Sequence, residues 1–303
     1  MLQFIKENLV IVAIGSFVLL VLVALLIVLL TRKKKEAHKK VDNGELIANA
    51  MKGDPESMHK LALAYLNGDG VEKDNEKAFE LFKKTSDKGY PNSFNYLGEC
   101  YLKGIGTTVN NPLAFEAFRR GSDLEDKEAM LNLAICYTHG TGTLQNFGKA
   151  FEFYKKSYEL NNLKAGPYLA GCYYAGEGIA VNYEKAFDIN QKLADNGDIL
   201  SLNRLGKMFL NGEGIAKNPE RAYKCFAKSA EKHDPKGMYN QAICLYNGLG
   251  CKKDPKLAFN LFKEASEAGY KKAMYNLYIC YLNGVGCKKD LDLANKWKEN
   301  FEK

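Results

Sequence analysis

Cysteine is the residue of this chain with the widest range of chemistry, and it occurs eight times. Five copies recur at one position of a sequence repeat: Cys100, Cys136, Cys172, Cys244 and Cys280. The chain has no C-x-x-C pair, which leaves zinc without a local chelate. Copies on successive packed helices would lie at least about 8–10 Å apart, beyond the roughly 7 Å between Cα atoms that a disulfide allows. We therefore predict reduced core thiols, with Cys244–Cys251 and Cys280–Cys287 as the pairs that could close locally in an exported protein.

Other reactive side chains form no recognisable catalytic set. The four histidines fall at unrelated positions of the repeat: His38, His59, His139 and His233. The loop around Asp69 resembles part of a calcium-binding EF-hand, but Tyr65 stands where the first carboxylate ligand should be. No phosphate-binding loop or nucleophile motif is present. The sequence predicts no catalytic, cofactor-binding or metal-binding residues, no small-molecule substrate and no enzymatic activity.

A paired glycine recurs seven times at a spacing of 36 residues without insertion or deletion. The first glycines of the pairs are Gly68, Gly104, Gly140, Gly176, Gly212, Gly248 and Gly284. A fixed period in this range is the signature of a repeat array. Positions are counted below from this first glycine.

The residues after each glycine pair predict a helix, helix B. The sixth position is always Asp or Asn, a helix N-cap preference, and the tenth is always Ala. Aromatic residues such as Phe79 and Phe82 follow at the spacing of one buried helical stripe. Gly53, Gly89, Gly197 and Gly269 follow helix B in four places.

The residues before each glycine pair predict a second amphipathic helix, helix A. Its seventh position back is Leu in six repeats, and its sixth back is Ala or Gly in six, which allows close helix packing. Each repeat therefore has helix A, a glycine loop that ends it, helix B and a turn.

These positions resemble the Sel1-like repeat family, a branch of the tetratricopeptide-like α-solenoids. The resemblance rests on motifs such as Leu61-Ala62-x-x-Tyr65, Gly68-x-Gly70-Val71 and Lys77-Ala78-Phe79. It implies an all-α superhelical solenoid of seven 36-residue helix-loop-helix repeats over residues 44–303, including an N-terminal capping helix at about 44–52. It also implies a non-catalytic scaffold that binds protein partners, in many members at a membrane.

An apolar segment precedes the repeats, and we predict that it spans a membrane. From Leu9 to Leu30 no residue is charged, and a helix of that length reaches about 33 Å, enough for a hydrocarbon core of about 30 Å. The predicted organisation is a short non-cytoplasmic tail at 1–8, a transmembrane helix at 9–30 and a basic juxtamembrane linker at 31–43. A cleaved signal peptide is the alternative, but the apolar run is too long and no small-residue cleavage site follows.

The charge distribution supports this topology. Residues 1–40 hold seven Lys or Arg and two Asp or Glu, so they carry +5 of the net +7. The cationic cluster between Arg32 and Lys40 predicts an external N-terminus and a cytoplasmic repeat domain, and it could also contact anionic lipid. The remaining +2 argues against nucleic acid as a partner.

The helical periodicity leaves one side of helix A available for binding. Positions one, five, eight and twelve before the glycine lie opposite its buried stripe. In tetratricopeptide-like solenoids this side lines the concave surface, so by resemblance we predict a protein-binding surface at position eight. Its residues are Lys60, Tyr96, Asn132, Tyr168, Arg204, Asn240 and Asn276.

The same residues equally suit a merely solvated helix face, and two broader alternatives to a membrane-anchored adaptor remain open. One is an exported or periplasmic structural protein with local disulfides. The other is a regulatory subunit of a membrane-associated enzyme.

Overall fold

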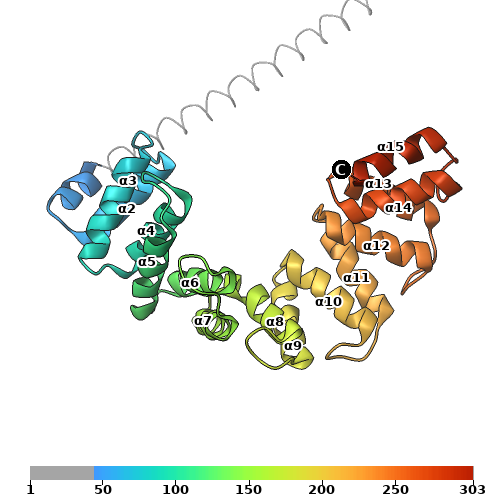
Figure 1. Cartoon of the computed structure of the whole chain (residues 1–303), viewed down its shortest axis with the longest axis horizontal. Coiled ribbons are helices and arrows are strands. Elements are labelled where there is room, and N and C mark those ends of the chain that lie inside the picture. The colour runs from blue at the N-terminus through green and yellow to red at the C-terminus, as the bar shows by residue number, and fades with distance from the viewer. Residues whose placement is uncertain (1–43, 303) are drawn as a thin grey trace, which may run out of the picture. The chain divides into compact units, whose positions relative to one another are not determined.

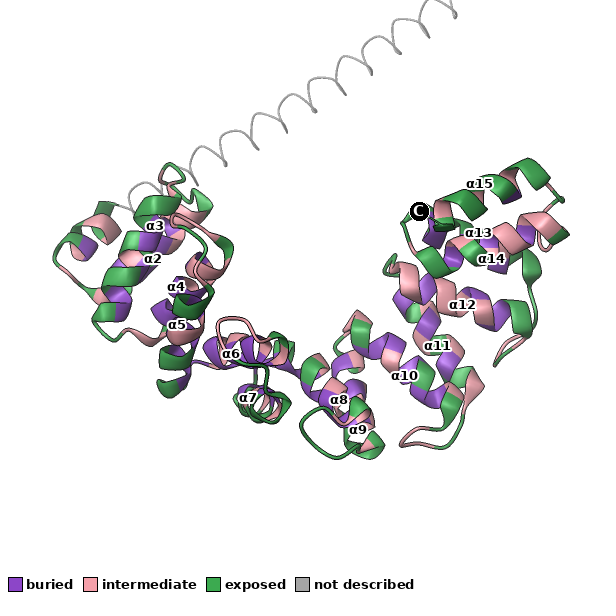
Figure 2. Ribbon diagram, in the orientation of Figure 1, coloured by how far each residue is buried: buried purple, intermediate pink, exposed green. Residues whose placement is uncertain are grey.

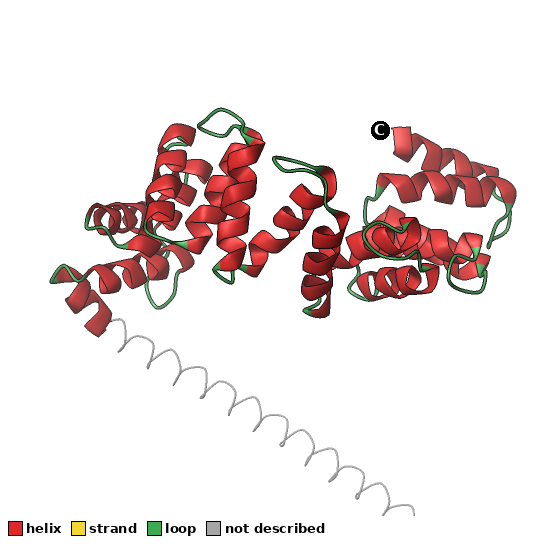
Figure 3. Ribbon diagram, turned by 90° about the horizontal axis from the view of Figure 1, so that it is seen from below, coloured by secondary structure: helices red, strands yellow, loops and turns green. Residues whose placement is uncertain are grey.

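A computed structural model describes residues 44–302 of the chain, and over that range it contains helices and connecting loops but no strand (Figure 3). The predicted tail, transmembrane helix and basic linker lie outside the described residues. None of the described helices has the length and apolar character needed to cross a bilayer. The described residues divide into two compact units, one that ends at Ala129 and one that begins at Met130.

The described part of the first unit consists of helix pairs in the predicted order (Figure 1). Residues 44–51 form a helix ahead of the first pair. The elements that follow are α2 (Pro55–Asn67), α3 (Asn75–Asp87), α4 (Pro91–Lys103), α5 (Asn111–Asp123) and the start of α6 (Lys127–His139). Ala50 packs with Met58 and Leu61, so the leading helix covers the apolar side of α2.

The second unit continues the alternation from α6 onward. It contains α7 (Phe147–Glu159), η1 (Leu163–Ala165), α8 (Gly166–Ala175), α9 (Tyr183–Asp195), α10 (Ile199–Asn211), α11 (Pro219–Ala230), α12 (Pro235–Asn247), α13 (Pro255–Glu267), α14 (Lys271–Asn283) and α15 (Leu291–Glu302). Even-numbered helices are the predicted helices A, and odd-numbered ones are the helices B. The prediction of an all-helical chain of seven helix-loop-helix repeats is confirmed.

The Asp or Asn that recurs at the sixth position of each repeat begins helix B as predicted. The side chain of Asn182, for example, accepts a hydrogen bond from the Lys185 amide at 2.9 Å, and Asn218 accepts one from Arg221 at the same distance. This bond satisfies one of the free N–H groups at a helix start.

The two glycines of each loop have different tasks, although both adopt a left-handed conformation. Gly212 ends α10 at φ +77°, and its amide donates to the Met208 carbonyl. Gly214 has φ +74°, and a Cβ there would overlap the carbonyl group of Tyr183, the first residue of the preceding helix B. The second glycine therefore lets one repeat's loop touch the backbone of the repeat before it.

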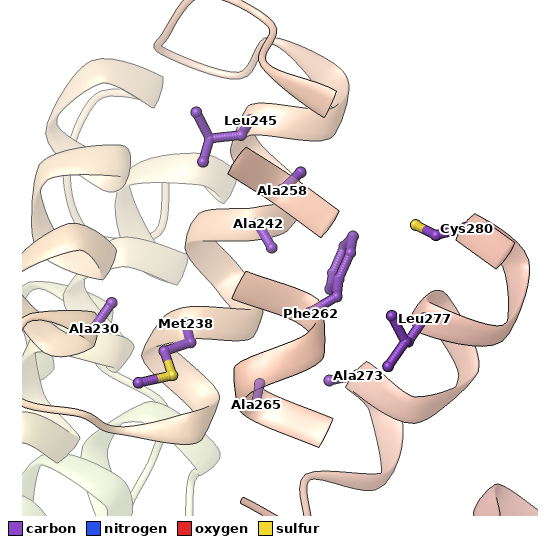
Figure 4. Close-up of a cluster of buried hydrophobic side chains, with 10 residues drawn as sticks. All are labelled: Ala230, Met238, Ala242, Leu245, Ala258, Phe262, Ala265, Ala273, Leu277 and Cys280. Carbon is purple, nitrogen blue, oxygen red and sulfur yellow. The ribbon is translucent and has the colours of Figure 1, made fainter. Parts of the chain in front are cut away.

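Small residues also allow helices A and B of one repeat to pack closely. The invariant alanines are at most 1% exposed in every repeat, from Ala78 to Ala294. A Cβ on Gly206 would overlap the ring of Phe226, which is 1% exposed. Ala242 and Phe262 belong to the corresponding cluster further along, together with Leu277 and Cys280 (Figure 4). Buried segments alternate with exposed and intermediate ones along the helices (Figure 2).

The turn after helix B departs from the glycine pattern in three repeats. Glu125, Asn161 and His233 adopt φ of 62°, 60° and 58°, at the same repeat position as Gly53, Gly89, Gly197 and Gly269. The left-handed turn is thus set by the repeat geometry, and a side chain there carries local strain.

Candidate functional site

The seven residues predicted to form a binding surface all lie on helices A. Lys60 and Tyr168 are exposed, whereas the other five are half-buried. Position eight is therefore a border between the buried stripe and the surface, and the two units use it differently.

In the first unit, position eight is occupied by side chains that already have partners. Lys60 forms an ion pair with Glu56 one turn earlier, with 2.6 Å between Nζ and Oε1. The Tyr96 ring stacks on Phe82 with 5.1 Å between centroids, and it lies 5.4 Å from the His59 ring. Tyr96 thus covers the core more than it offers a free aromatic face.

His59 is a buried titratable group that the sequence did not single out. It is 6% exposed, and its Nδ1 shares a hydrogen bond of 2.8 Å with Ser93 Oγ. Thr85 Oγ1 donates to the same Ser93 oxygen at 2.6 Å. Burial lowers the pKa of His59, because the surrounding Phe82, Tyr90 and Tyr96 rings solvate a charged imidazole poorly.

In the second unit, Tyr168 and Arg204 line one cavity. The Tyr168 ring stacks on Tyr154 with 5.1 Å between centroids. Arg204 Nη1 donates to the Pro167 carbonyl at 2.8 Å, which joins α10 to α8. A side chain on Gly171 would meet Arg204 Nη2 at 3.5 Å, so this glycine leaves room for the guanidinium. The cavity has a volume of about 290 Å³.

A second pocket shares Pro167 and Tyr168 with the first. It measures 580 Å³, and its lining is mostly apolar, with Leu163 and Leu200 exposed by 51% and 59%. Lys164 and Asp198 supply its charged groups. Tyr168 therefore lines both a cavity that contains Arg204 and Glu177 and a more apolar pocket that contains Lys164 and Asp198.

The asparagines of position eight make weaker contacts. Asn240 Nδ2 lies 3.5 Å from Asn203 Oδ1, and Asn203 itself donates to Asp234 Oδ2 at 2.8 Å. Asn276 Nδ2 donates to the Lys272 carbonyl at 3.1 Å. Asn132 is half-buried on α6. Asn240 and Asn276 retain carbonyl oxygens that suit the amides of an extended chain.

Sequence reasoning named positions five and twelve as surface positions but did not examine their charges. In the second unit they hold four lysines, which are Lys164 in η1, Lys207 on α10, Lys236 on α12 and Lys272 on α14. Comparing charge by repeat position would have found them.

The cysteines are thiols throughout the described structure. Burial raises the pKa of Cys100, Cys136 and Cys172 to about 11 and that of Cys244 and Cys280 to about 12. A thiol with so high a pKa is a poor nucleophile near neutral pH. Between residues 44 and 302, no group of three His, Cys, Asp or Glu side chains could hold a metal ion.

Comparison with known families decides the relationship. A model described as the Sel1 repeat matches seven segments: 55–90, 95–126, 127–162, 168–198, 199–234, 235–270 and 271–297. The chain belongs to the Sel1 repeat family. Proteins built from these repeats are generally protein-interaction scaffolds, and the resemblance inferred from the repeat positions is confirmed.

Solved structures agree with this assignment. A Sel1 repeat protein from Oxalobacter formigenes is 27% identical with a TM-score of 0.74, and the match covers 80% of this chain and 96% of that one. A protective antigen of uropathogenic Escherichia coli with an SLR fold is 26% identical with a TM-score of 0.75 over 85% of this chain. This match covers only 55% of the Escherichia coli protein. No curated protein matches the chain.

Proposed function

We propose that this protein is a non-catalytic adaptor, tethered to a membrane by residues 9–30, whose repeats hold partner proteins on the helix-A face. The observation that carries the proposal is the pair of pockets that share Tyr168. Residues of α8 and α10 line both of them, and they combine an exposed aromatic ring, the Arg204 cation and an apolar hollow. Aromatic and arginine side chains beside pockets are the groups that most often dominate protein–protein affinity.

Site-specific photocrosslinking in cells tests the binding face. A benzophenone amino acid in place of Tyr168 should crosslink to a defined protein, because this side chain is 47% exposed. The matched control is the same replacement of Tyr183, which begins helix B of the same repeat and is 39% exposed. Equal crosslinking from both positions, or none from Tyr168, would contradict a helix-A binding surface.

The proposed topology rests on the basic residues that follow the apolar segment. Protease added to intact cells should leave the repeat domain whole, and alkylation without reductant should label all eight cysteines. Digestion without lysis, or protection of Cys280 and Cys287, would favour the exported alternative. In the described structure the Cys287 thiol donates a hydrogen bond of 3.5 Å to the Cys280 carbonyl, and both cysteines are free thiols.

A further inference from the structure

The helix-A faces of the two units carry different charge. At positions one, five, eight and twelve, the described first unit has three glutamates and two cations, and both cations form ion pairs: Lys60 with Glu56 and Lys103 with Glu99. The same positions of the second unit hold five cations and no carboxylate: Lys164, Arg204, Lys207, Lys236 and Lys272. We call these five residues the basic face.

None of the basic-face cations forms an ion pair within the described chain. Lysines on other helices of the second unit do, as with Lys155 and Glu159 or Lys263 and Glu267. Arg204 makes a single hydrogen bond, to the Pro167 carbonyl, and burial lowers its pKa. Asp198 lies within electrostatic range of Arg204, but its carboxylate accepts the Ser201 amide at 2.7 Å as the N-cap of α10.

Lys236 lies close enough to three other members of the basic face to be repelled by them. Burial lowers the pKa of Lys236, and Lys207, Arg204 and Lys272 lower it further through like-charge repulsion. Asp234 is the one carboxylate that opposes this effect, and it already accepts hydrogen bonds from Asn203, Ser229 and the Gly237 amide. The repulsion that Asp234 leaves uncompensated is relieved when a further carboxylate binds.

We propose that the basic face binds an acidic protein segment in extended conformation, with carboxylates against the cations and one apolar side chain in the pocket beside Tyr168. A segment that crosses α8, α10, α12 and α14 would pass three helix spacings of about 9 Å, which about eight to ten extended residues can reach. The proposal rests on the adaptor function and specifies its partner. The 580 Å³ apolar pocket and the asparagine carboxamides favour a polypeptide over a phosphate polymer, which would leave the pocket unfilled.

Fluorescence anisotropy with the full chain in detergent micelles tests the proposal. The probe is a labelled peptide of about ten glutamates with one central leucine, the length derived above. A peptide with glutamine in place of glutamate should bind at least about tenfold more weakly. Added salt should steeply reduce the affinity of the acidic peptide. Replacing the probe's leucine by serine should also weaken binding if the pocket is used.

Two matched double variants locate the contact. The double variant Lys207→Gln with Lys272→Gln removes two exposed cations of the basic face and should reduce the affinity for the acidic peptide about tenfold or more. Lys192→Gln with Lys256→Gln removes two exposed cations from helices B and should change binding by less than about twofold. Because all four side chains are exposed, none of these changes disturbs packing.

Equal losses from both double variants, or equal binding of the glutamate and glutamine peptides, would overturn the proposal. Tighter binding of an oligothymidylate or of phosphatidylserine vesicles than of the acidic peptide would also overturn it. The two proposals can be told apart. A partner that crosslinks to Tyr168 but whose binding does not depend on the basic face would support the adaptor function and rule out only the acidic ligand.

Discussion

Substituting the two glycines of one loop separates conformational strain from a steric clash. Gly212 and Gly214 both have a left-handed backbone, at φ +77° and +74°. The conformational strain of alanine at either position should therefore lower the free energy of unfolding by a similar amount, about 1–2 kcal/mol. Their surroundings differ. A Cβ at Gly212 has its nearest neighbour 3.5 Å away, at the Lys217 amide, which is an ordinary contact.

At Gly214 the added Cβ would overlap the carbonyl of Tyr183 and come within 2.9 Å of the Glu184 amide nitrogen. These are backbone atoms at the start of α9, and they cannot rotate away as a side chain would. Relieving the overlap requires the loop after α10 to move off the preceding repeat, at an overpacking cost of about 1–3 kcal/mol. We therefore expect Gly214→Ala to lose about 2–5 kcal/mol in all, against about 1–2 kcal/mol for Gly212→Ala.

Urea denaturation of each variant measures the total, and hydrogen exchange shows where the loss occurs. In Gly214→Ala, the amides at the start of α9 and the end of α10 should lose protection first, because stability in repeat arrays depends on neighbouring interfaces. Gly250→Ala, whose Cβ would overlap the Pro219 carbonyl, should repeat the result one repeat later. Equal losses at Gly212 and Gly214 would refute the division of tasks between the two glycines.

Three further predictions follow from buried or strained residues. The folded pKa of His59 lies below its unfolded value of about 6.5, so the contribution of neutral His59 to the free energy of unfolding is fully present above that pH. This contribution is lost as the pH falls through the folded pKa, by up to about 1.4 kcal/mol per unit of pKa lowering. His59→Asn should reduce the difference in stability between urea titrations at about pH 7.5 and about pH 5.5. Glu125→Gly should raise unfolding free energy by up to about 1 kcal/mol by relieving its positive φ, and an unchanged or lower value would argue against strain. Ala186→Leu, at a fully buried site, should cost about 1–3 kcal/mol and split the unfolding transition, so a single unchanged melt would contradict its packing role.

The repeat positions predicted most of the fold because the constraints there are local. An Asn at the sixth position caps a helix wherever it occurs, and a glycine that ends helix A is left-handed in every copy. The 36-residue spacing also explains the positive φ of Glu125 and His233, because both align with Gly53 in the repeat. The 3₁₀ turn that precedes α8 does not follow from the repeat pattern.

The binding surface was less predictable because helical periodicity fixes a direction but not the neighbours. Tyr96 and Tyr168 share position eight, yet Tyr96 covers Phe82 and His59, whereas Tyr168 stacks on Tyr154 and stays 47% exposed. Asn190 shows the same limit inside the core. It replaces the aromatic residue of this position, and its Oδ1 is buried without a hydrogen-bond partner in the described structure. Such differences depend on side chains from neighbouring helices.

The fold places few demands on the outer side of helix A, and this freedom explains how similar repeats can differ in function. Caps, paired glycines, invariant alanines and core aromatics occupy other positions, so the outer positions can change charge without loss of packing. In the first unit they hold Lys60 and Lys103 in ion pairs with glutamates one turn away. In the second unit Arg204 and Lys236 have no such carboxylate. A partner that recognises charge would therefore distinguish repeats whose backbones are nearly equivalent.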